Sequence, residues 1–186
     1  MRILVAYATR HGATAGIAKR IAEMLERAGH SVTLQRAADV SRVDDHDAYV
    51  IGSAAYMGSW LKEASDFVRR NRQLLAQQPV WLFSSGPIGT QLVDDKGRDV
   101  IEASRPAEFA EFESAIHPRD EHVFFGAYDP DAPAVGLLEK VGSWFTRMPS
   151  IRKEIPAGDF RDWPAIEAWA DGIASDLTAA PVLSPA

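Results

Sequence analysis

The sequence predicts an α/β domain built on a doubly wound parallel sheet, with helices covering both faces. Short apolar runs alternate with amphipathic segments of helical period along most of the chain, and each run is apolar at consecutive positions. Consecutive apolar residues are typical of strands buried on both faces, and alternation of strand and helix produces right-handed βαβ crossovers. Because the chain offers five such runs and a short first crossover, we expect a five-stranded sheet of order 2-1-3-4-5.

The five runs are rich in β-branched and aromatic residues and are too short to be helices. Ligands of doubly wound sheets lie beyond the carboxyl ends of the strands, so the residues that follow each run are candidates for a site. The expected strands are Ile3–Ala8, Val32–Leu34, Tyr49–Ile51, Val80–Phe83 and Val123–Tyr128.

Three amphipathic segments are predicted as helices. The first covers Ala13–Ala28, with apolar residues at helical spacing, and Gly29 is a suitable C-terminal cap. The second covers Ser59–Ala76 and carries its apolar residues along one stripe. The last covers Trp163–Leu177 and begins after Asp162, a residue type that often caps helix N-termini.

Two stretches have a weaker pattern. Leu92–Glu121 predicts a loop followed by a helix around Glu102–Ile116 that docks loosely on the sheet, and Ala134–Ile155 contains an amphipathic piece with a basic end.

A length of 186 residues suits one continuous core. We therefore expect a single domain over residues 1–180 and a loose tail at 181–186.

Composition excludes several classes of function. A formal net charge of -6 gives no general attraction for phosphate backbones, so we expect no nucleic-acid partner. Without cysteine there are no disulfides, thiolate metal sites or cysteine nucleophiles, and redox chemistry would need a bound cofactor. The histidines lack zinc-site spacing, so no metal is expected. A strand begins at the first residues and no apolar run approaches the ~20 residues of a membrane span, so we expect a cytoplasmic protein.

The loop Thr9–Thr14, between the first strand and the first helix, is the first candidate site. Successive backbone N–H groups and the positive end of a helix dipole converge there, as a phosphate group requires. Thr9 and Thr14 add hydroxyl donors, and Gly12 permits a close approach. A capped helix with a glycine in its turn accounts for the same residues equally well. The chain has no G-x-x-x-x-G-K-[ST] and no G-x-G-x-x-G, which disfavours nucleoside triphosphate hydrolysis and ordinary NAD binding.

Two further loops leave the same edge of the sheet. Gly52–Trp60 follows the third strand and Ser84–Gly89 follows the fourth, and both contain small residues that let backbone approach a flat ligand. Such a slot suits an isoalloxazine ring, which needs backbone donors and acceptors at its polar edge and an aromatic or methionine face for stacking. Tyr56 is the preferred stacking residue. Trp60 or Met57 could replace it, unless these two anchor the following helix to the sheet.

The pattern Thr9-x-x-Gly12-x-Thr14, with Gly52-Ser53-Ala54-Ala55-Tyr56 and Ser84-Ser85-Gly86-Pro87 after later strands, resembles the flavodoxin domain family. Within it the chain is most similar to the menaquinone-dependent protoporphyrinogen IX dehydrogenase branch, whose phosphate loop also reads Thr-Arg-x-Gly-x-Thr. The resemblance implies a flavodoxin-like three-layer sandwich that binds FMN at the three loops. The candidate cofactor-binding residues are Thr9, Arg10, His11, Gly12, Ala13, Thr14, Ser53, Ala54, Ala55, Tyr56, Met57, Gly58, Ser84, Ser85, Gly86, Pro87 and Gly89.

Three functions are compatible with this resemblance. The first is a flavin-dependent oxidoreductase that passes electrons from a porphyrinogen substrate to a quinone. In that case the apolar, partly basic segment Leu137–Lys153 would face a membrane or cover a substrate, although an ordinary surface helix has the same pattern. The second is a flavodoxin-type electron carrier, whose acidic surface would suit protein redox partners. The third is an interaction module that has lost its flavin. No catalytic side chain is expected, because the flavin carries the chemistry.

Overall fold

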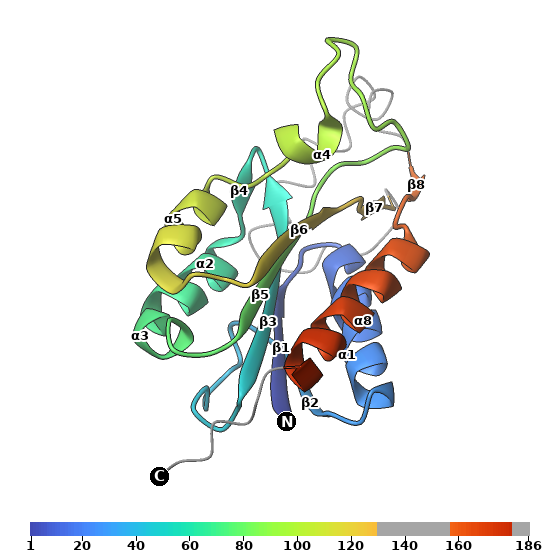
Figure 1. The fold of residues 1–186 in the computed structure, drawn as a ribbon. Coiled ribbons are helices and arrows are strands. Elements are labelled where there is room, and N and C mark those ends of the chain that lie inside the picture. The colour runs from blue at the N-terminus through green and yellow to red at the C-terminus, as the bar shows by residue number, and fades with distance from the viewer. Residues whose placement is uncertain (130–156, 180–186) are drawn as a thin grey trace.

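The computed structural model describes residues 1–129 and 157–179, which form three layers around a central sheet (Figure 1). Five parallel strands are hydrogen-bonded in the order β2-β1-β3-β5-β6. Because β4 (Ser59–Trp60) is a short antiparallel strand, β5 and β6 are the fourth and fifth parallel strands along the chain. The order is therefore the predicted 2-1-3-4-5, and the expected fold class is confirmed. The strands are β1 (Arg2–Ala8), β2 (Ser31–Arg36), β3 (Ala48–Tyr56), β5 (Val80–Ser85) and β6 (Asp120–Phe124).

Helices pack on both faces of the sheet, and each face has its own apolar cluster. One face carries α1 (Ala13–Arg27) and α8 (Trp163–Ala179), whose buried residues meet one side of the strands. The other face carries the shorter helices over a cluster that contains Phe67, Phe109 and Phe112. These helices are α2 (Lys62–Arg70), α3 (Arg72–Leu75), α4 (Val100–Ala103) and α5 (Glu108–Ile116).

The helix predicted over Ser59–Ala76 is wrong at its start and in its continuity. Ser59–Trp60 forms strand β4, which pairs antiparallel with the end of β3. The connecting residues Met57 and Gly58 have φ values of 52° and 78°, the left-handed backbone that two-residue hairpin turns require. Helix α2 then ends before Asn71, whose side-chain amide donates to a carbonyl four residues back in the last turn.

Two other predicted elements are divided in the structure. The run Val123–Tyr128 contains the end of β6 and a separate strand β7 (Ala127–Tyr128), which pairs antiparallel with β8 (Gly158–Asp159) outside the main sheet. The helix predicted at Glu102–Ile116 is interrupted near Pro106, because proline cannot continue an α-helix. The segments 134–155 and 181–186 lie outside the described residues.

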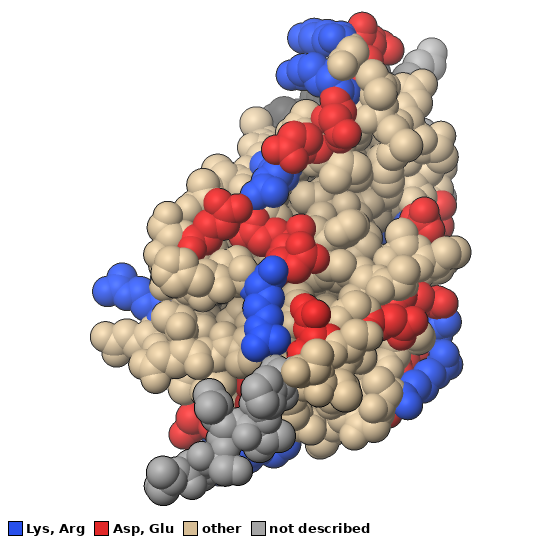
Figure 2. Space-filling model, in the orientation of Figure 1, with Lys and Arg blue, Asp and Glu red and all other residues tan. Residues whose placement is uncertain are grey.

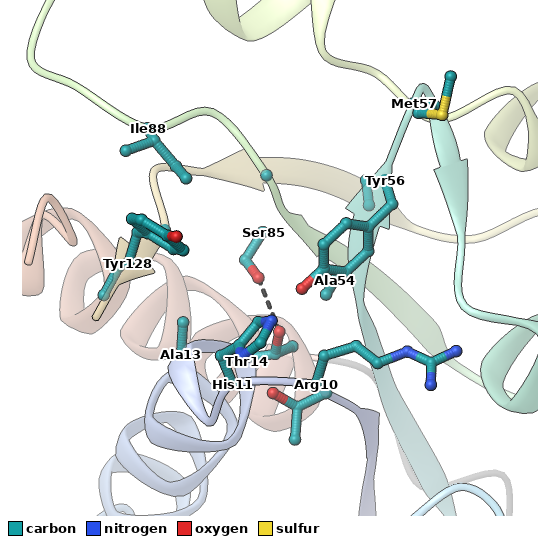
Figure 3. Close-up of a pocket in the computed structure, with 15 residues that line it drawn as sticks. Arg10, His11, Ala13, Thr14, Ala54, Tyr56, Met57, Ser85, Ile88 and Tyr128 are labelled. Atoms are coloured by element: carbon teal, nitrogen blue, oxygen red, sulfur yellow. Dashed lines mark hydrogen bonds between the residues drawn. The ribbon is translucent and has the colours of Figure 1, made fainter. Parts of the chain in front are cut away.

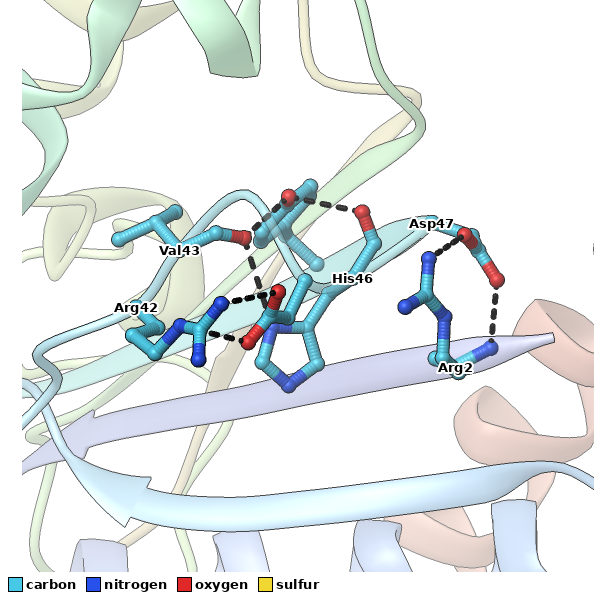
Figure 4. A network of polar contacts seen from close by, with 7 residues as sticks. Arg2, Arg42, Val43, His46 and Asp47 are labelled. Atoms are coloured by element: carbon cyan, nitrogen blue, oxygen red, sulfur yellow. Dashed lines mark hydrogen bonds and ion pairs between the residues drawn. The ribbon is translucent and has the colours of Figure 1, made fainter.

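The amino ends of the strands are stabilised by a polar network in the β2–β3 connection (Figure 4). The Asp47 carboxylate accepts from the backbone N–H of Arg2 at 2.8 Å and from its guanidinium at 2.9 Å. These hydrogen bonds lower the pKa of Asp47 below its ordinary value. The Tyr49 hydroxyl lies 2.7 Å from the carbonyl oxygen of Val43 and 2.9 Å from that of His46. This network stabilises the edge of the sheet opposite to the candidate site.

Charged side chains of both signs gather over α4 and α5 (Figure 2). Among them, Arg105 forms ion pairs with Glu102, Glu113 and Glu121. The guanidinium of Arg105 lies 3.0 Å from a carboxylate oxygen of Glu113 and 2.8 Å from one of Glu121. The Glu121 side chain is only 7% exposed, and burial together with the Glu113 charge raises its pKa to about 7. Among the described helices, none combines the length and the apolar character needed to span a bilayer.

Candidate functional site

The three loops predicted from the sequence meet at the carboxyl edge of the sheet around a cavity of about 320 Å³ (Figure 3). This volume falls within the ~300–1,000 Å³ range of small-molecule sites. The lining comes from the β1–α1 loop, the β3–β4 hairpin, the end of β5 with the residues after it, and the β6–β7 segment. It consists of Thr9, Arg10, His11, Ala13, Thr14, Ala54, Ala55, Tyr56, Met57, Ser85, Gly86, Ile88, Gly126, Ala127 and Tyr128.

The N-terminus of α1 has no side-chain cap. Gly12 occupies the capping position with a φ of 86°, a left-handed conformation that strains other residues, and the first turn contains no acidic side chain. By contrast, Asp99 and Asp162 cap α4 and α8 by accepting backbone N–H donors at 2.9 and 3.1 Å. Thr9 holds the loop by accepting from the Gly12 N–H at 3.1 Å. The α1 terminus therefore keeps backbone donors for an anion.

A hydroxyl pair joins two of the loops beneath the cavity. The Oγ1 of Thr14, in the first turn of α1, lies 2.7 Å from the Oγ of Ser85 at the end of β5 (Figure 3). Thr14 is fully buried and Ser85 is 4% exposed. Because the bond crosses from α1 to the sheet, it sets the position of the first helical turn relative to β5.

Two tyrosines flank the cavity from opposite sides. Tyr56, at the end of β3, and Tyr128, in β7, both line it and lie on opposite sides of it (Figure 3). Met57 also lines the cavity, but it is fully exposed at the tip of the hairpin. Trp60 is 5% exposed and packs against the rings of Phe109 and Phe112, with centroid distances of 5.4 and 5.6 Å, so it anchors α5 instead of facing the cavity.

The wall segment Gly126–Tyr128 is absent from the sequence prediction, whereas Ile88 lies within the predicted loop Ser84–Gly89 but was not among its candidate residues. The N–H of Gly126 donates to the carbonyl of Pro87 at 2.8 Å, and its own carbonyl accepts from Phe160 at 3.1 Å. These bonds bring the segment after β6 against the loop after β5. A signal was available, because the carboxyl end of the fifth parallel strand must reach the same edge as the others.

Six of the predicted residues lie near the cavity but do not line it. The hydroxyl of Ser53 accepts from the backbone N–H of Leu61 at 3.1 Å, which ties β3 to the start of α2. The Ser84 hydroxyl is buried without a hydrogen-bond partner among the described residues. Pro87 contributes its carbonyl to Gly126. The remaining three, which adopt turn conformations of positive φ, are Gly12, Gly58 and Gly89.

The charge of the cavity differs from that of the chain. Its described lining includes the cationic Arg10, His11 and no carboxylate, although the protein as a whole is acidic. A second cavity of about 630 Å³ adjoins it and shares the lining residues His11, Ala13, Ala127 and Tyr128. An anionic group would therefore be favoured where the loop meets α1.

A sheet of this strand order, with a cavity bounded by the loops at its carboxyl edge, defines a flavodoxin-like α/β protein. Comparison with family models shows that the chain belongs to the flavodoxin domain family, whose model, described as "Flavodoxin domain", matches residues 4–142. No curated protein gives a significant match to the sequence.

Solved structures of similar fold include two flavodoxins and one larger enzyme. A flavodoxin from the domain Archaea is 15% identical, with a TM-score of 0.57, and the match covers 96% of this chain and 99% of that one. Oxidised flavodoxin 2 from Bacillus cereus is 20% identical, with a TM-score of 0.59 and coverage of 95% and 99%. Rubredoxin oxygen:oxidoreductase from Desulfovibrio gigas is 16% identical, with a TM-score of 0.58, and covers 96% of this chain but 36% of the enzyme. At these identities the likeness shows the fold alone.

Proposed function

We propose that the protein binds FMN in the 320 Å³ cavity and acts in electron transfer. The observation that carries the proposal is the uncapped N-terminus of α1, which opens into a cavity flanked by Tyr56 and Tyr128. A phosphate needs such unpaired N–H donors and a flat ring needs the two aromatic faces. Membership of the flavodoxin domain family supports the same ligand.

Different groups of cavity residues fit different parts of FMN, the phosphate and the ring. The loop Thr9–Thr14 would hold the phosphate through backbone N–H groups and hydroxyls, with the cationic Arg10 in the same loop. The backbone of Ala54–Ala55 and of Ser85–Gly86 would meet the polar edge of the ring. Gly86 suits this position, because a Cβ there would lie 3.5 Å from the Cβ of Ala55 and narrow the slot.

Bound FMN would supply one- and two-electron redox chemistry, while the protein contributes position, burial and local electrostatics. Tyr56 is 46% exposed and Ile88 37% exposed, so the cavity has a solvent-facing opening bordered by apolar side chains. Electrons could pass through this opening to an acceptor without a protein side chain as intermediate. We accordingly assign no catalytic side chain.

The narrower proposal is that the acceptor is an apolar quinone and that the donor is a porphyrinogen. It is favoured by the exposed apolar residues that follow the cavity lining: Leu92 and Val93 are 64% and 56% exposed in the loop after Ile88, and Met57 is fully exposed on the opposite rim. A protein redox partner is the alternative acceptor, which the acidic groups around Arg105 would suit if that partner is basic.

One experiment tests FMN binding, and a second tests the donor and acceptor. Purified protein mixed with FMN should quench flavin fluorescence, with saturation at one FMN per chain. Unchanged flavin emission would contradict the proposal that the protein binds FMN. The FMN-loaded protein should then be mixed anaerobically with protoporphyrinogen and a menaquinone analogue. Turnover supports the oxidoreductase, and its absence alongside fast reduction by a ferredoxin reductase supports the carrier.

A further inference from the structure

One arginine connects the C-terminal part of the chain to the first turn of α1. Arg161 lies in the segment between β8 and α8, and its Nη1 donates to the carbonyl oxygen of Ala13 at 3.3 Å. Ala13 is also part of the cavity lining. The contact joins residues 148 positions apart in the sequence, and it ends at the helix terminus to which the phosphate is assigned.

The guanidinium of Arg161 is fixed on several sides. Its Nε donates to Oδ1 of Asp159 at 2.7 Å, and its Nη2 lies 2.5 Å from Oδ2 of the same carboxylate. The plane of the group lies over the ring of Trp163, with its carbon 4.4 Å from the ring centroid. Only 17% of the side chain is exposed. Because the guanidinium held in this way has little rotamer freedom, it can fix the position of the Ala13 carbonyl that it contacts.

Gly16 provides the space that this arrangement needs. A Cβ at Gly16 would lie 2.3 Å from Nη1 of Arg161, closer than any real contact allows. Glycine inside a helix is less favourable than alanine, so its place in the first turns of α1 is explained by the packing of the guanidinium. Gly172 in α8 is a useful contrast, because a Cβ there would meet nothing within 4 Å.

The same contacts reach the cavity wall. Asp159 belongs to β8 and pairs with Ala127 of β7, next to Tyr128. The pair Arg161–Asp159 therefore links two sides of the cavity, the first turn of α1 and the strand that carries Tyr128. We propose that Arg161 is a positioning residue that fixes the first turn of α1, and with it the phosphate end of the flavin site; this rests on the proposed function.

Substitutions at Gly16 and Arg161 test the proposal in the full-length protein, with riboflavin as a ligand that lacks the phosphate. Gly16→Ala should displace the guanidinium and weaken FMN binding about fivefold to tenfold, while riboflavin binding changes less than twofold. Arg161→Ala should show the same selectivity, and adding Gly16→Ala to it should cost nothing further because the clash is gone. Gly172→Ala is the matched control and should bind both ligands as the wild type does.

Equal weakening of FMN and riboflavin, additive losses in the double variant, or wild-type FMN affinity in Gly16→Ala would each overturn the positioning role. Amide hydrogen exchange at Gly16, whose N–H donates to the carbonyl of Gly12 at 3.0 Å, provides a readout that needs no flavin. This amide should exchange faster in Arg161→Ala than in the wild type, and equal rates would refute the proposal. If the wild-type protein binds no FMN but exchange is still faster in Arg161→Ala than in the wild type, the proposed function fails. The role of Arg161 in fixing the first turn of α1 is then still supported.

Discussion

The buried hydroxyl pair of Thr14 and Ser85 allows a quantitative test of how the site is built. Thr14→Val keeps the side-chain volume but leaves the Ser85 hydroxyl, 4% exposed, without its 2.7 Å partner. An unsatisfied buried hydroxyl costs about 1–3 kcal/mol, so each single substitution, including Ser85→Ala, should lower the free energy of unfolding of the apoprotein by that amount. Removing both hydroxyls leaves no orphaned group, and the double variant should lose about 1–2 kcal/mol less than the sum of the two single losses.

Urea denaturation of the four apoproteins measures this coupling, and an unchanged m-value would show that the comparison is sound. The same variants report on the cofactor: Thr14→Val should weaken FMN binding by about 1–2 kcal/mol, roughly tenfold, because a hydroxyl near the phosphate is lost. Strictly additive stability losses would refute the hydroxyl pair. Unchanged FMN affinity in Thr14→Val would refute the assignment of Thr14 to the phosphate.

Three further predictions concern other parts of the molecule. Alanine at Tyr56 or at Tyr128 should weaken FMN binding by about 1 kcal/mol and reduce fluorescence quenching, measured by titration; loss at Tyr56 alone would contradict a two-sided slot. The fold raises the pKa of Glu121 to about 7 from its ordinary value of 4.5, so the folded chain binds more protons than the unfolded chain, and stability should fall as pH rises from about 4.5 to 7. Glu121→Gln should remove about 1–2 kcal/mol of this dependence in denaturation at pH 5 and pH 8, and parallel curves would contradict the burial argument. Gly52→Ala places a Cβ 2.0 Å from a phenylalanine ring and should destabilise by about 1–3 kcal/mol in thermal melts, whereas Gly172→Ala should not.

The sheet was predictable because buried parallel strands leave a local signal. The runs at Ile3–Ala8 and Val80–Phe83 are apolar at every position, and the structure adds only one or two residues to their ends. The loop Thr9–Thr14 follows from them, because the first strand and first helix are both strongly patterned and leave little room between. The positions of the candidate loops were therefore accessible from the chain alone.

The hairpin at Met57 and Gly58 was not accessible in the same way. The stripe of apolar residues after Ser59 continues with helical spacing, and a methionine in left-handed backbone is not a typical turn signal. What selects the hairpin is the packing of Trp60 on Phe109, a residue 49 positions further along the chain. Pairing over that distance leaves no mark in the local pattern.

The wall at Gly126–Tyr128 was missed because its contacts are also distant. The run that contains it has a strand composition, and nothing local indicates that the sheet ends at Phe124. Gly126 is held by the carbonyl of Pro87 and the N–H of Phe160, which lie on either side of it in the sequence. Tyr128 consequently comes to lie across the cavity from Tyr56 only after three separate segments have come together (Figure 3).

Equilibrium titration of the purified protein with FMN, followed by flavin fluorescence and by the visible absorbance spectrum, tests the central claim most directly. We expect quenching that saturates at one FMN per chain, with a perturbed absorbance band from the two tyrosine faces and weaker binding of riboflavin. Emission and absorbance identical to free FMN at micromolar protein would contradict the account, because the uncapped α1 terminus and the cavity would then have no flavin to hold.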